Sequence, residues 1–232
     1  MRHMILKSSL VLAVAFAAPL SFARDEAPDA LLNGVTLEVM SILKRDNELQ
    51  ACSAARIADV IETKMLPLFD FARMTQAALA RNWRLASPDQ QAMLTAEFKT
   101  LLVRTYSAGL ASYRDRVIEF KRMRMAPGDT EVKVKTEVVQ GGTERMAIDY
   151  DTEKTPAGWR VYDIKVGGVS LITTYRESFA DVVRDRGVDG LIKSLSDTNR
   201  HADSGVKSAK STFRDQSRIV LAVLQSALLG RR

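Results

Sequence analysis

Apolar residues in the first half of the chain recur every three or four positions, which is the period of an amphipathic helix. These stripes predict three successive helices with capping side chains at Asp29, Ser53 and Asp70. The longest helix is predicted over residues 88–112, behind a capping box made by Ser87 and Gln90. Its apolar face is broad, which is typical of a helix that touches two neighbours or lines a cavity.

From residue 117 the pattern changes to a period of two, which marks half-buried strands. Apolar and charged residues alternate along four segments that are joined by turns rich in Gly and Pro. The first segment, 117–125, shifts its apolar phase between Phe120 and Met123, and this shift predicts a β-bulge. The four segments together predict an antiparallel sheet with one charged face and one face covered by helices.

Helical patterns return after Gly168, which ends the last predicted strand. One helix is expected to begin after Thr173 or Thr174 and to stop at Gly187. A short final helix is expected after Asp189. The predicted fold class is therefore α+β, with N-terminal helices on a curved four-stranded antiparallel sheet, C-terminal helices, and an apolar cavity between the layers.

Composition divides the chain into three parts. Residues 1–23 place Arg2 and Lys7 ahead of an uncharged apolar run, which predicts a cleaved signal peptide; the alternative is a retained anchor helix. The run is shorter than the roughly 20 residues that a spanning helix needs. Residues 24–195 form the predicted α+β domain. Residues 196–232 are predicted to be a polar linker and an amphipathic helix, which docks on its own domain, a partner or a membrane surface.

Charge and residue types narrow the range of functions. The formal net charge of +6 suits contact with anionic lipid surfaces or acidic partners. Basic residues are dispersed and lack interleaved aromatics, so nucleic acid is not expected as a partner. The single cysteine, Cys52, excludes an intramolecular disulfide, and export without disulfides indicates a bacterial periplasmic protein. His201 is the only histidine after residue 23, which argues against a catalytic triad or a multi-histidine metal site.

Three carboxylates were weighed as catalytic groups. Asp149 and Asp151 fall on the charged face of a predicted strand and are interpreted as exposed charges. Asp163 is the strand carboxylate whose neighbours favour burial. It suits either a structural hydrogen-bond acceptor or the acid of a small-molecule isomerase or hydrolase of cone-shaped α+β fold. Because no base partner accompanies it, we predict that the chain is not an enzyme.

The inward apolar faces define a candidate binding site. A curled sheet leaves volume beneath its helices, although the same stripes also suit a plain filled core. The candidate residues on the sheet are Met123, Val134, Val138, Met146, Ile148, Tyr150, Val161 and Val166. Those on the helices and on the turn before the last helices are Leu102, Tyr106, Leu110, Val169, Ile172 and Tyr175.

Two blocks of sequence resemble a known family. One is VYDIKVGGVSLITTYR, within residues 159–195, and the other is FDFARMTQAALARNWRLASPDQQAMLTAEFKTLLVRTYSAGL, residues 69–110. Both are similar to the MlaC family, also called the toluene-tolerance auxiliary family, of periplasmic phospholipid-binding proteins. The similarity extends from about Val35 to Leu195.

The resemblance implies a periplasmic carrier whose cavity holds acyl chains, with phospholipid as cargo and no other cofactor or metal. Its partners would be an outer-membrane lipoprotein complex and an inner-membrane ABC transporter complex of an Mla-type system, and it would be a monomer that approaches membranes transiently. A hopanoid or another polycyclic lipid is the alternative cargo. Because no cluster of Arg and Lys marks one mouth in the sequence, weak head-group selectivity is predicted.

Overall fold

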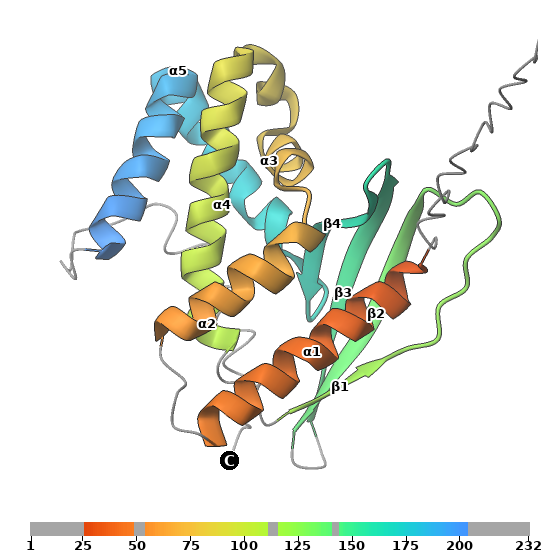
Figure 1. Ribbon diagram of the computed structural model, residues 1–232. Coiled ribbons are helices and arrows are strands. Elements are labelled where there is room, and N and C mark those ends of the chain that lie inside the picture. The colour runs from red at the N-terminus through yellow and green to blue at the C-terminus, as the bar shows by residue number, and fades with distance from the viewer. Residues whose placement is uncertain (1–25, 49–53, 111–115, 141–143, 204–232) are drawn as a thin grey trace, which may run out of the picture.

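The computed structural model describes residues 26–48, 54–110, 116–140 and 144–203 (Figure 1). The predicted signal peptide, Cys52 and the C-terminal amphipathic stretch lie outside these ranges. The helices are α1 (Pro28–Glu48), α2 (Ala54–Val60), α3 (Phe71–Leu79), α4 (Pro88–Leu110) and α5 (Leu171–Asp203), with short helical turns η1 (Ile61–Met65), η2 (Leu66–Leu68) and η3 (Ala80–Leu85). None of the helices in the described ranges combines the length and the apolar character needed to span a bilayer.

One antiparallel sheet forms the second layer, in the order β1-β2-β3-β4-β5. The strands are β1 (Val117–Phe120), β2 (Glu131–Gln140), β3 (Glu144–Thr155), β4 (Gly158–Val166) and β5 (Val169–Ser170). The predicted α+β architecture is confirmed, but the sheet has five strands where four were expected. The additional strand, β5, exists because Gly167 and Gly168 adopt positive φ angles of 55° and 83° and turn the chain back onto β4.

The predicted bulge in the first strand is wrong in position. β1 ends at Phe120, and the register shift lies between Asp151 and Thr152 of β3. There Thr152 is opposite Val161, whereas Asp151 is opposite Asp163, so that Tyr162 is the additional residue. The bulge changes the alternation along β4, and Val161 and Val166 therefore lie on the same face of the sheet although they are five positions apart.

The helices cover this apolar face in two groups (Figure 1). Helix α1 lies across β2, and its Leu32 is buried against Val134 and Val161. Helices α3, α4 and α5 pack on one another and cover the other end of the same face, around Val138 and Met146. The opposite face carries the charged residues of the strands, as the alternation predicts.

Two predicted helix starts are confirmed by their hydrogen bonds. The Asp70 carboxylate accepts from the backbone N–H of Arg73 at 2.8 Å and caps α3. The Ser87 hydroxyl accepts from the N–H of Gln90 at 3.2 Å, while the Gln90 side chain accepts from the N–H of Ser87 at 2.9 Å. This reciprocal pair is the predicted capping box at the start of α4.

Helix α5 differs from its prediction at both ends. It begins at Leu171, ahead of Thr173. At Gly187 (φ 69°, ψ −176°) the backbone is not helical, and a kink separates two helices there, as the sequence predicts. It also continues through Asp203, into the segment predicted to be a linker. The continuation is held by Asn199, which is buried and whose side-chain amide donates to the Glu97 carboxylate of α4 at 2.6 Å.

Candidate functional site

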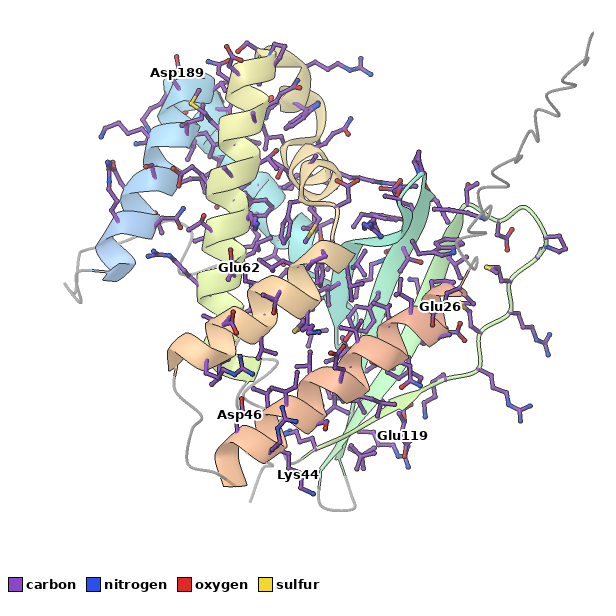
Figure 2. The ribbon with its side chains drawn as sticks, viewed as in Figure 1. Glu26, Lys44, Asp46, Glu62, Glu119 and Asp189 are labelled. Carbon is purple, nitrogen blue, oxygen red and sulfur yellow. The ribbon has the colours of Figure 1, made fainter. Side chains whose placement is uncertain are left out.

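The covered face of the sheet carries almost only apolar side chains. Thr136 and Thr152 are the buried polar residues among them, and their hydroxyls donate to the backbone oxygens of Ile148 and Val132 at 2.7 and 2.8 Å. Their polarity is therefore satisfied within the sheet. Figure 2 shows how side chains from the helices and strands meet over this face. The face therefore offers a ligand apolar contact, and the hydroxyl groups of these two threonines are already used in hydrogen bonds within the sheet.

The predicted site residues fall into two neighbouring apolar clusters, where one was expected. The first, between the sheet and α3, α4 and α5, contains Leu102, Tyr106, Val138, Met146, Ile148, Val166, Val169, Ile172 and Tyr175. The second, beneath α1, contains Met123, Val134, Tyr150 and Val161. The side chain of Leu110 lies outside the described part of the chain. Phe69 and Ile164 pack against both clusters and connect them.

Helix α1 contributes to a third apolar cluster as well. Its Val39 and Leu43 are buried with Val60 of α2. Met40 of the same helix packs against the first cluster, while Leu32 belongs to the second. A domain of this size usually has one contiguous core with small satellites. The interior here follows that pattern, with one large cluster and two small ones of three buried residues each, and α1 touches all of them.

Apolar side chains between the clusters retain contact with solvent. Tyr106, Ile148, Tyr150 and Ile164 are only partly buried. Large apolar residues on the covered side of a sheet are normally shielded more completely. These four side chains are therefore part of the apolar surface that the protein covers incompletely.

The far side of the first cluster is densely packed. Phe98, Tyr175 and Phe179 are fully buried, and Phe98 lies edge-on to both other rings at centroid distances of 5.1 Å. Such edge-to-face packing stabilises a filled core. Tyr175 is therefore a core residue at the boundary of the candidate site, and Tyr106, whose hydroxyl lies 3.5 Å from that of Tyr175, is only partly buried.

Sequence reasoning missed four residues that complete the apolar surface: Leu32, Met40, Phe69 and Ile164. Regular alternation from Val161 puts Ile164 on the opposite face, whereas the register shift at Tyr162 places it opposite Tyr150 on the covered face. Phe69 forms an isolated parallel bridge with Val161, and the N–H of Asp70 donates to the Val161 oxygen at 2.9 Å. The hydrophobic stripe of α1 was the available signal for Leu32 and Met40.

Asp163 is buried and serves as a hydrogen-bond acceptor. Its carboxylate accepts from the Ser170 hydroxyl at 2.6 Å and from the backbone N–H of Ile172 at 3.3 Å. Ser170 in turn accepts from the N–H of Thr173 at 3.0 Å, so both side chains cap the first turn of α5. Burial raises the pKa of Asp163, and the hydrogen bonds from Ser170 and Ile172 oppose this shift.

The charged groups near Asp163 include Asp151, which lies opposite it in β3, and Lys165. Asp151 is only 15% exposed and pairs with Lys165 at 2.6 Å and Lys133 at 3.5 Å, so it belongs to an ion-pair network and is not the free surface charge that was expected. Within the described ranges, no group of three or more His, Cys, Asp or Glu side chains is placed to hold a metal ion.

Basic residues do gather at one place, contrary to the expectation from the sequence. A hollow of about 390 Å³ lies between β2 and the connection that leads into it from β1. Five of its nine lining residues are basic and two are acidic. The lining consists of Lys121, Arg122, Met123, Arg124, Asp129, Glu131, Val132, Lys133 and Lys135.

Comparisons with known proteins agree with this architecture. The toluene tolerance protein Ttg2D of Pseudomonas putida is 23% identical over 202 residues, which cover 84% of this chain and 93% of that protein. The intermembrane phospholipid transport system binding protein MlaC of Haemophilus influenzae is 18% identical over 174 residues, covering 74% of this chain and 78% of that protein.

A solved structure is also similar. It is the phospholipid-binding protein from Ralstonia solanacearum in complex with a phospholipid, with 37% sequence identity and a TM-score of 0.69 over 77% of this chain and 99% of that chain. The family model of the MlaC protein matches residues 33–197, which include every described helix and strand in whole or in part. The chain therefore belongs to the MlaC protein family.

Proposed function

We propose that the chain is a phospholipid-binding carrier. The observation that carries this proposal is the incomplete burial of Tyr106, Ile148, Tyr150 and Ile164, which belong to the apolar clusters on the covered face of the sheet. Acyl chains are the ligand that matches an extended surface of this kind, since they need apolar contact and no hydrogen bonds. The similarity to a phospholipid-bound protein at 37% identity supports the same assignment.

In this mechanism the acyl chains lie on the covered face of the sheet and the polar head group stays near water. Helix α1 is the element that separates to admit them, because it contributes only Met40 to the first cluster and only Leu32 to the second. Met40, Met123 and Met146 add adaptable side chains to the lining, which suits chains of differing length and unsaturation.

The energetics suit a carrier. Burying one methylene group is worth about 0.8 kcal/mol, so two chains of about fifteen carbons gain on the order of 20 kcal/mol relative to water. Leaving a bilayer costs a similar amount. The free energy of moving a lipid from a bilayer to the protein is therefore close to zero, while release of the lipid into water is strongly unfavourable. The carrier itself sets no direction, and any uphill step draws on energy supplied by its partners.

The same proposal covers the cellular role. The chain is a periplasmic component of an Mla-type system that passes phospholipid between an outer-membrane complex and an inner-membrane ABC transporter complex. The signal-like residues 1–23 and the names of the relatives, which refer to intermembrane phospholipid transport and toluene tolerance, support this role. Binding and transfer require no catalytic residue, and Asp163 is assigned to capping α5.

Mass spectrometry of the natively purified protein tests the proposal. The intact protein should carry additional mass that matches phospholipid, and solvent extraction should release phospholipids with two acyl chains. A protein that is free of lipid after expression in cells with abundant phospholipid would contradict the proposal. Recovery of a hopanoid in place of phospholipid would show that the assigned cargo is wrong, but it would still support an apolar binding site.

A further inference from the structure

The hollow between β2 and the β1–β2 connection combines two kinds of surface. Lys133 and Lys135 reach it from the charged face of β2. Val132 belongs to the opposite face, where it pairs with the buried Thr152. Met123 lines the hollow and also packs against the apolar cluster beneath α1. The hollow therefore passes around the edge of β2 and adjoins the proposed acyl-chain surface.

The acidic residues of the hollow are already engaged. Glu131 pairs with Arg73 at 2.6 Å, and the Asp129 carboxylate accepts from the backbone N–H of Ala126 at 2.7 Å. Two of the lysines also have partners, since Lys121 pairs with Glu137 at 2.7 Å and Lys133 with Asp151 at 3.5 Å. The acids therefore offset part of the positive charge and leave the rest available.

Three cations of the hollow remain. The side chains of Arg122, Arg124 and Lys135 are exposed, and within the described part of the chain none of them forms an ion pair or a side-chain hydrogen bond. Arginine presents several N–H donors in a planar fork that matches two oxygens of a phosphate group. Arg122, Arg124 and Lys135 line the same hollow. Their N–H donors are therefore available to bind a phosphate group.

We infer that this hollow binds the phosphate of a phospholipid whose acyl chains lie beneath α1. The inference rests on the proposed function and specifies its head-group site. Met123 lies where glycerol would join the two parts, since it touches both the hollow and the apolar cluster. The site recognises a phosphate ester, so it favours anionic phospholipids over diacylglycerol with the same chains.

The test compares two lipids that differ only in the head group. Full-length mature protein is stripped of lipid and offered phosphatidylglycerol or diacylglycerol of identical chains in detergent micelles, and bound lipid is quantified by native mass spectrometry. The variant Arg122→Gln with Arg124→Gln should lower the preference for phosphatidylglycerol by roughly threefold to tenfold. The matched control, Arg81→Gln with Arg84→Gln on η3, removes the same charge from exposed positions outside the hollow and should leave the preference unchanged.

The outcomes separate the inference from the proposed function. If both lipids bind and the preference is the same in the wild type and the hollow variant, the head-group site is wrong and the carrier stands. If the wild type binds neither lipid, the proposed function fails and the site fails with it. Titration with inorganic phosphate alone, followed by ³¹P NMR, distinguishes a site for a lipid head group from a site for free phosphate. Binding of free phosphate as tight as that of phosphatidylglycerol would overturn the assignment to a lipid head group.

Discussion

The hydroxyl groups of Tyr106 in α4 and Tyr175 in α5 lie 3.5 Å apart. Tyr175 is fully buried among Phe98 and Phe179, whereas Tyr106 is only partly covered. The pair therefore stands at the boundary between the filled core and the apolar region that is left open towards α1. A change at Tyr106 should alter the ligand site without disturbing the core behind it.

Replacing Tyr106 with Trp should reduce bound lipid. The larger ring occupies space that an acyl chain would take, while the position is half-buried and tolerates added volume better than the core does. Lipid bound per protein, measured by extraction and mass spectrometry, should fall by at least about half, and the thermal unfolding midpoint should change by only a few degrees.

The control for this experiment is Tyr106→Phe, which keeps the ring and removes the hydroxyl. It should bind lipid like the wild type, because the hydroxyl contact is long and the ring supplies the apolar surface. Equal lipid occupancy in the Trp variant and the wild type would place the acyl chains elsewhere.

Removing the Asp163 carboxylate should destabilise the start of α5. In Asp163→Ala, the hydroxyl of Ser170 and the backbone N–H of Ile172 lose their acceptor in a buried setting, which costs about 1–3 kcal/mol. Asp163→Asn can still accept from Ile172 and donate to Ser170, so its loss should be smaller. Urea denaturation measures both free energies of unfolding. A catalytic role, in contrast, would leave the stability of the Ala variant unchanged.

The stability of the protein should also depend on the protonation of Asp163. Burial raises the pKa of this carboxyl in the folded state, so the folded protein retains a proton at pH values where the unfolded chain has lost it. Its contribution to stability is complete below the ordinary pKa of aspartate, about 4, and is lost as the pH rises through the raised folded pKa.

The difference in unfolding free energy between the wild type and Asp163→Asn isolates this effect. Glu119, Glu137 and Asp197 have lowered pKa values and contribute in the opposite direction, but they are present in both chains and cancel. The wild type should lose stability relative to the Asn variant as the pH rises above about 4. A difference that does not vary with pH would contradict the raised pKa.

Replacing Gly187 in α5 should destabilise the protein. Its φ of 69° and ψ of −176° lie in a region that only glycine adopts readily, so Gly187→Ala should cost about 1–3 kcal/mol by backbone strain alone. No neighbouring atom lies within 4 Å of an added Cβ. Gly34→Ala, in the regular helix α1 and equally uncrowded, is the matched control and should raise stability by up to about 1 kcal/mol. Urea midpoints that shift equally would contradict the strain argument.

Local patterns predicted most of the fold because they act over a few residues. The capping box at Ser87 and the cap at Asp70 depend on side chains three positions from their partners, and both are present. The same holds for the alternation that separates Val134 and Val138 from Lys133 and Lys135 in β2.

Features that depend on contacts between distant segments were not predictable in this way. The bulge at Tyr162 follows from the pairing of β3 with β4, and the ring is covered by Arg73, whose guanidinium carbon lies 3.7 Å from the ring centroid. The division of the apolar interior depends on where α1 crosses the sheet. The basic hollow arises because the β1–β2 connection brings Arg122 and Arg124 close to Lys133 and Lys135, which the sequence places about ten residues further along.

Photo-crosslinking with a phospholipid that carries a diazirine near the end of one acyl chain tests the central claim most directly. After loading and irradiation, peptide mass spectrometry locates the modified residues. The account predicts adducts on α1 and on the covered face of β2, β3 and β4, at residues such as Met40, Ile148 and Ile164. Adducts restricted to the charged face of the sheet, or a protein that takes up the lipid with no adduct on the covered face, would contradict it.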